Sequence, residues 1–149
     1  MENNSGNLTI NPQIKNTYGF LILSCSSVLI GIVSKDKKEI NFESTINNKD
    51  WKEIRGHSRN RYYRCFLDRQ REVTKYIDEH LEQFFIKDNM LNISGLIIAG
   101  QKNPINRYLT NKIRKLTMDK YITTIIELEY DGKSGFDQAI YLSMINDNL

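Results

Sequence analysis

The stretch SRNRYYRCFLDRQREVTKYIDEHLEQFF, residues 58–85, decides the fold expected of this chain. Apolar and long side chains recur in it at steps of three and four, which is the spacing of one face of an amphipathic helix. Ser58 suits the N-cap, because its hydroxyl can accept a hydrogen bond from the first turn. The stripe comprises Tyr63, Phe66, Gln70, Val73, Ile77, Leu81 and Phe84. We therefore predict one helix of about 27 residues, roughly 40 Å long.

Arginine gathers at the start of this stretch and on the side away from the stripe. Between residues 55 and 71 the chain carries six arginines and a single acid, Asp68. A solvated helix face usually mixes charges of both signs, so this concentration favours contact with nucleic acid. The flat guanidinium group also suits the recognition of phosphates and bases. The residues that we predict to bind RNA are Lys52, Arg59, Arg61, Arg64, Arg69, Arg71 and Lys75.

Strand-like and shorter helix-like segments surround the long helix. Runs of β-branched and apolar residues predict strands over residues 18–24, 28–33, 38–42, 94–100 and 121–130. A short helix is predicted over 103–116, between the last two of these strands. A loop over 131–135 and a closing helix over 136–145 come after the last strand. The polar, asparagine-rich residues 1–17 predict a flexible N-terminal tail. The predicted fold class is α/β: a single domain over residues 18–149, with a mixed, mostly antiparallel sheet of about five strands flanked by helices.

Composition excludes several classes of protein. The length of 149 residues suits one domain, and 40% hydrophobic with 26% charged residues is ordinary for a globular protein. No apolar run approaches the ~20 residues of a membrane helix, and the N-terminus lacks the regions of a signal peptide. Two cysteines and two histidines cannot build a zinc-spaced cluster. We therefore expect a cytoplasmic protein without metal, cofactor, membrane partner or small-molecule substrate.

Five segments, in order along the chain, resemble the middle domain of the class 1 eukaryotic peptide release factor. They are Gly19-Phe20, Arg61-Tyr-Tyr-Arg64, Gln83-Phe-Phe-Ile86, Leu91-Asn-Ile-Ser-Gly-Leu-Ile-Ile-Ala-Gly100 and Gly135-Phe-Asp-Gln-Ala-Ile-Tyr-Leu-Ser143. The resemblance implies a mixed sheet wrapped by helices, with a loop projecting at the start of the long helix. It also implies a partner, the large ribosomal subunit, whose peptidyl transferase centre that loop reaches. We expect this chain to be the middle domain alone.

The predicted loop departs from the family at its tip. The family has a glycine-glycine-glutamine tripeptide there, whose glycines adopt backbone angles closed to other residues and whose glutamine positions water. Counting back from Arg61 aligns Arg55, Gly56 and His57 with the tripeptide and Ser58 with the serine that follows it. Histidine is a common general base, but no orienting group lies near His57 in the sequence. We therefore expect these four residues to form a peptidyl transferase centre loop without catalytic residues, and no enzymatic activity.

These features predict a ribosome-binding factor that occupies the tRNA-site region, contacts ribosomal RNA and blocks translation, as a dormancy or hibernation factor would. Two alternatives stay open. One is a minimal peptidyl-tRNA hydrolase or release factor, in which Gly56 and His57 would be essential. The other is a module of stalled-ribosome rescue that acts together with a second protein chain.

Overall fold

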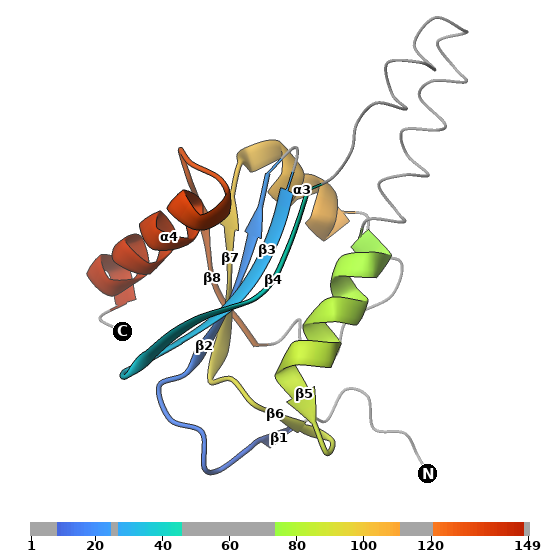
Figure 1. The fold of residues 1–149 in the computed structure, drawn as a ribbon, viewed down its shortest axis with the longest axis vertical. Coiled ribbons are helices and arrows are strands. Elements are labelled where there is room, and N and C mark those ends of the chain that lie inside the picture. Colours follow the sequence, from blue (N-terminus) through green and yellow to red (C-terminus); the bar gives the residue numbers. More distant parts are fainter. Residues whose placement is uncertain (1–8, 25–26, 46–73, 111–120, 148–149) are drawn as a thin grey trace, which may run out of the picture.

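The structure is a computed structural model that describes residues 9–24, 27–45, 74–110 and 121–147. Its centre is a five-stranded sheet in the order β4-β3-β2-β7-β8 (Figure 1). All six residues of β7 are buried, as its continuous apolar run predicts for an inner strand. The five predicted strands and the mixed sheet are confirmed. Their bounds are β2 (Tyr18–Leu23), β3 (Ser27–Ser34), β4 (Lys37–Thr45), β7 (Gly95–Gly100) and β8 (Ile122–Glu127).

The pairing in this sheet is half antiparallel and half parallel. β2 pairs antiparallel with β3, and β3 with β4, because these strands follow one another directly in the chain. β7 pairs parallel with both β2 and β8. The chain enters β7 after the helix over residues 74–85 and enters β8 after α3 (Lys102–Thr110), and such crossovers return it to the same end of the sheet. The sheet therefore contains more parallel pairing than the sequence indicated.

One face of the sheet is covered by α4 (Gly132–Asp147), the red helix of Figure 1. Phe136 is fully buried there and meets Phe20 edge to face, with 5.4 Å between the ring centroids. Lys38 of β4 forms an ion pair with Asp137 and lies over the Phe136 ring. α4 is thus fixed both to the middle of the sheet and to its edge strand.

The first turn of α4 lies in the predicted loop over residues 131–135. Asp131 is a residue type favoured at N-caps, and its carbonyl accepts a hydrogen bond from the N–H of Gly135 at 3.0 Å. Gly132 has a φ of 57°, which glycine adopts at little cost. The loop prediction is therefore wrong from residue 132 onward, because this Asp-Gly pair starts the helix earlier.

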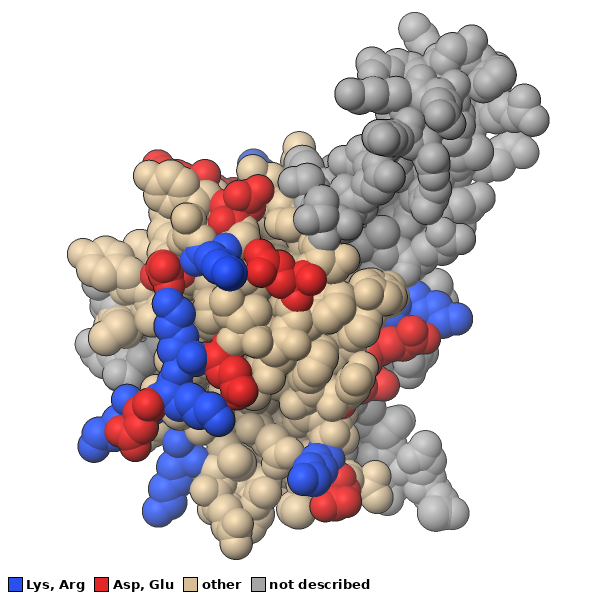
Figure 2. All heavy atoms as spheres, viewed as in Figure 1, with Lys and Arg blue, Asp and Glu red and all other residues tan. Residues whose placement is uncertain are grey.

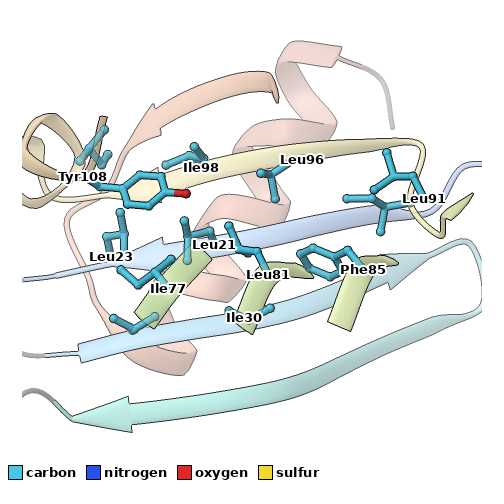
Figure 3. Packing of buried hydrophobic residues seen from close by; sticks show 13 residues of the cluster. Leu21, Leu23, Ile30, Ile77, Leu81, Phe85, Leu91, Leu96, Ile98 and Tyr108 are labelled. Carbon is cyan, nitrogen blue, oxygen red and sulfur yellow. The ribbon is translucent and has the colours of Figure 1, made fainter. Parts of the chain in front are cut away.

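The opposite face is covered by the helix over residues 74–85 and by α3 (Figure 3). Ile77, Leu81 and Phe85 of the helix are at most 2% exposed, so its apolar stripe ends at Phe85. Phe84, which we predicted as the last stripe residue, lies partly buried beside the cluster. The described residues confirm the C-terminal part of the predicted long helix. The other buried members of the cluster are Leu21, Leu23, Val28, Ile30, Leu91, Ile93, Leu96, Ile98, Ile105 and Tyr108.

A second sheet, of three short strands, lies beside the end of this helix (Figure 1). It consists of β1 (Thr9–Ile10), β6 (Met90–Leu91) and β5 (Ile86–Lys87) in that order. β1 pairs parallel with β6, and the N–H of Asn11 donates to the carbonyl of Leu91 at 2.9 Å. The folded part of the chain therefore begins before residue 18, where we predicted the flexible tail to end, because backbone groups of this segment have partners in the domain.

We expect the substitution Gly100→Ala to destabilise the fold by about 2–3 kcal/mol. A Cβ at this position would lie 1.9 Å from the carbonyl oxygen of Leu23, and the φ of Gly100 is 146°. Leu23 pairs with Gly100 in the sheet, so it cannot move away without breaking that pairing. Thermal unfolding should show a loss of about 6–10 °C in Tm.

The matched control for this prediction is Gly132→Ala. Gly132 also has a positive φ, of 57°, but the nearest atom to a Cβ there is Oε2 of Glu43 at 3.6 Å. Backbone strain alone costs about 1–2 kcal/mol. Equal losses of Tm in the two variants would contradict a clash at Gly100.

Candidate nucleic-acid interface

Of the predicted site residues, the structure describes Lys75. The others fall within residues 46–73, outside the described part of the chain, so their mutual arrangement stays a prediction. The structure does describe the two elements on either side of that segment, namely β4, which ends at Thr45, and the helix that is described from Thr74 onward. The predicted residues outside the described part are Lys52, Arg55, Gly56, His57, Ser58, Arg59, Arg61, Arg64, Arg69 and Arg71.

Lys75 is exposed on the first described turn of the helix, and it forms no ion pair with another described residue. The charged residues that follow it in the helix over residues 74–85 are all acidic: Asp78, Glu79 and Glu82. Asp78 is buried, but Glu79 and Glu82 reach the surface, where their charge would repel phosphate rather than bind it. The basic character of the predicted RNA-binding segment therefore does not extend along the helix beyond Lys75.

Four aromatic rings join β4 to this helix, and we call them the aromatic cluster: Phe42, Tyr76, His80 and Phe84. Phe42 stacks on His80, with 4.3 Å between ring centroids and an interplanar angle of 21°. Tyr76 meets His80 edge to face at 4.2 Å, and the centroid of Phe84 lies 6.1 Å from that of His80. Sequence reasoning missed this cluster, although the spacing of its three helix members, i, i+4 and i+8, could have indicated a second aromatic row beside the stripe.

A buried polar contact ties the same helix to α3. The hydroxyl of Tyr108 donates to Oδ1 of Asp78 at 2.8 Å, and both residues are less than 5% exposed. Buried polar groups are usually paired in this way, because an unpaired one costs free energy. The helix is thus attached to the domain on three sides: by its apolar stripe to the sheet, by the aromatic cluster to β4, and by Asp78 to α3.

The charges on the face shown in Figure 2 are mixed, with basic and acidic side chains interspersed. One of the ion pairs joins Lys37 to Glu39 at 3.4 Å. Within the described residues, no group of three or more His, Cys, Asp or Glu side chains could hold a metal ion. None of the described helices is long and apolar enough to cross a membrane. The arginine concentration over residues 55–71 stays the predicted interface.

Two solved structures of archaeal proteins have the same fold as this chain. Pelota from Archaeoglobus fulgidus superposes with a TM-score of 0.56 at 18% sequence identity, over 87% of this chain and 32% of that one. The archaeal translation termination factor aRF1 gives a TM-score of 0.52 at 17% identity, over 84% of this chain and 33% of that one. In both cases the chain corresponds to one part of a longer protein.

Curated relatives of similar sequence also match this chain over one part of their length. Over 138 residues the chain is 29% identical to eukaryotic peptide chain release factor subunit 1 of Loxodes striatus, which covers 89% of this chain and 30% of that protein. The corresponding subunit of Didinium nasutum is 25% identical over 126 residues, or 85% of this chain and 29% of that protein. The chain thus spans less than a third of the length of these two relatives. Residues 17–148 match the family described as eRF1 domain 2, and the chain therefore belongs to this family, the middle domain of the eukaryotic release factor.

Proposed function

We propose that this chain is a non-catalytic ribosome-binding factor that occupies the peptidyl transferase centre of the large subunit and blocks translation. The observation that carries the proposal is the sequence Arg55-Gly56-His57-Ser58 in a domain of the release-factor family. It combines a basic segment suited to ribosomal RNA with a tip that lacks the residues of peptide release. A dormancy or hibernation factor has this combination of properties.

The residues of the predicted tip disfavour catalysis of peptide release. In the family, the two glycines let the backbone approach the ester of peptidyl-tRNA, and the glutamine positions the attacking water. Arg55 brings a Cβ and a long cationic side chain to the first of these positions, and His57 replaces an amide with a ring. Correct placement of reacting groups accounts for much of the rate of such reactions, so a misplaced tip loses most of it. A tip of this kind still fills space in the site.

The charge of the arginine segment favours binding to RNA. The six arginines between residues 55 and 71 stand against one acid in the same interval, whereas the described helix beyond Lys75 is acidic. Arginine forks match phosphate oxygens with two hydrogen bonds, which fixes orientation as well as affinity. The charge change along the helix therefore directs RNA contact toward the segment between β4 and the helix. We place this binding in the cytoplasm, where ribosomes translate.

The proposal is tested by adding the protein to vacant and to translating eukaryotic ribosomes. We expect co-sedimentation with vacant ribosomes, loss of the puromycin reaction, and no release of peptide from peptidyl-tRNA above background. The puromycin reaction reports access to the peptidyl transferase centre, so its loss together with binding identifies a blocking factor. A ribosome complex that keeps full puromycin reactivity would contradict the proposal.

The same experiment separates the two alternatives. Peptide release that depends on Gly56 and His57 would make the chain a minimal peptidyl-tRNA hydrolase. Activity on stalled ribosomes only after a second chain is supplied would make it a rescue module. The family match favours neither, because the flanking parts of the release factor lie outside the segment that this chain matches.

A further inference from the structure

We propose that the aromatic cluster of Phe42, Tyr76, His80 and Phe84 is a positioning device, which holds the end of β4 against the first described turn of the helix, the two elements that flank residues 46–73. The inference rests on the proposed function, because that segment carries the predicted ribosome-binding residues. The cluster lies close to both ends of the segment. Phe42 precedes the end of β4 at Thr45 by three positions, and Tyr76 follows Thr74, the first described residue of the helix, by two.

The contacts within the cluster are arranged so that one strand residue touches three helix residues. The centroid of Phe42 lies 5.9 Å from that of Tyr76, 4.3 Å from that of His80 and 6.3 Å from that of Phe84. The three helix rings occur at i, i+4 and i+8, so they form one row along the helix. Contacts along such a row oppose tilting of the helix relative to the strand, whereas a single contact would act as a pivot.

The cluster supplies a constraint that the core does not. Ile77, Leu81 and Phe85 hold the helix on the sheet through one apolar stripe, and the buried hydrogen bond from Tyr108 to Asp78 ties it to α3. The aromatic row lies beside that stripe and reaches the edge strand of the sheet. Because the two rows bind different parts of the sheet, together they fix the roll of the helix as well as its position. The end of β4 and the start of the described helix are thereby held in a fixed relation to each other.

The edge strand β4 contains a β-bulge next to the aromatic cluster. Ile30 pairs with Phe42 and Gly31 with Ile40, so Asn41 is the extra residue of a β-bulge. Bulges at sheet edges bend the strand and re-aim its side chains. Here the bulge lies directly before Phe42, the single strand residue of the cluster. The amide oxygen Oδ1 of Asn41 is buried without a hydrogen-bond partner, which is a cost that the strand bears at this point.

His80 contributes its ring rather than a hydrogen bond. Its Nδ1 atom is buried and has no hydrogen-bond partner, although its ring contacts all three other members of the cluster. A phenylalanine would keep the stacking surface without burying an unpaired nitrogen. We therefore expect His80→Phe to preserve the function of the cluster, and His80→Ala to remove it.

The test compares His80→Ala, Phe42→Ala and His80→Phe with a control from the other face of the sheet, Phe136→Leu. Phe136 belongs to a ring pair with Phe20 whose centroids are 5.4 Å apart, and it is fully buried, so its loss reduces stability without touching the cluster. Two readouts are taken, both at a temperature where circular dichroism shows every variant folded. The first is hydrogen exchange of the free protein, and the second is affinity for vacant ribosomes by co-sedimentation.

We expect His80→Ala and Phe42→Ala to raise amide exchange in the last residues of β4 and the first described turn of the helix, with β7 and α4 unchanged. Their ribosome affinity should fall about tenfold, because the two elements that flank the predicted binding residues are no longer held together and must be ordered on binding. His80→Phe should keep affinity within about twofold of the wild type, and Phe136→Leu should behave likewise despite its lower Tm.

Equal exchange patterns in the cluster variants and the control would overturn the positioning role. If the wild type binds ribosomes and the cluster variants bind them with the same affinity, the positioning role is overturned as well. Loss of affinity in His80→Phe would also overturn it, because the nitrogen rather than the ring would then matter. If the wild type itself fails to bind, the proposed function is wrong, while the exchange data on the free protein still decide whether the cluster holds the two elements together.

Discussion

The double substitution Arg61→Gln and Arg64→Gln is expected to lower the affinity of the chain for vacant ribosomes about 100-fold. Each arginine is predicted to donate charge-assisted hydrogen bonds to ribosomal RNA, and such contacts contribute about 1.5 kcal/mol or more each. Glutamine keeps much of the length of the side chain and removes the charge. Equilibrium co-sedimentation at fixed salt measures the effect directly.

The control for this prediction removes the same charge elsewhere. Lys35 and Lys37 are exposed lysines at the β3–β4 turn, so Lys35→Gln with Lys37→Gln changes the net charge by the same amount. That variant should bind within about threefold of the wild type, because non-contacting surface charges act only through screened, long-range attraction. A similar loss in both double variants would mean that net charge, and not the arginine segment, determines binding.

Salt dependence gives an independent measure of the same contacts. If all six arginines between residues 55 and 71 contact phosphates, log affinity against log salt should have a slope of about −4 to −5. Removing Arg61 and Arg64 should make the slope less steep by about 1.4–1.8. A wild-type slope near zero would contradict an electrostatic contact with RNA altogether.

Local patterns were sufficient to predict the elements of the large sheet. Apolar and β-branched runs predicted β2, β3 and β7 close to their observed bounds, because burial of a strand leaves a continuous apolar run in the sequence. They did not predict the pairing of β7 with β2 and β8, because strand order depends on where connections place the chain. β1 was missed for a related reason. A strand of two residues has no periodicity, and Thr9 finds its partner Met90 only in the folded chain.

The residue composition of the candidate site could be predicted from the sequence, but the contacts between β4 and the helix that flank it could not. The arginine concentration is visible in the sequence, and so are Arg55, Gly56 and His57, which we align with the family's tripeptide, since both are short-range features. The contact of Phe42 with the aromatic row of the helix is not visible, because Phe42 and His80 are brought together by the packing of a helix beside an edge strand. The end of the apolar stripe shows the same limit of sequence-based prediction. A helical pattern indicates a stripe, but whether Phe84 or Phe85 is fully buried depends on how the helix packs on the sheet.

The double substitution Arg55→Gly and His57→Gln is expected to confer peptidyl-tRNA hydrolysis on this chain, at least about 100-fold above the wild type. It restores the family's glycine-glycine-glutamine tripeptide around Gly56 and leaves the arginines of the helix in place. If the loop reaches the peptidyl transferase centre as it does in the family, the restored backbone freedom and amide should position water at the ester. Release of labelled peptide from ribosomal complexes measures the gain.

The single variants make this prediction specific. His57→Gln alone should stay near background, because Arg55 still places a Cβ where the backbone must approach the substrate. Arg61→Gln with Arg64→Gln, added to the restored tripeptide, should remove the gain again by weakening binding. If the variant with the glycine-glycine-glutamine tripeptide binds ribosomes and abolishes the puromycin reaction yet releases no peptide, then the loop does not place the tripeptide at the ester, and this prediction is wrong.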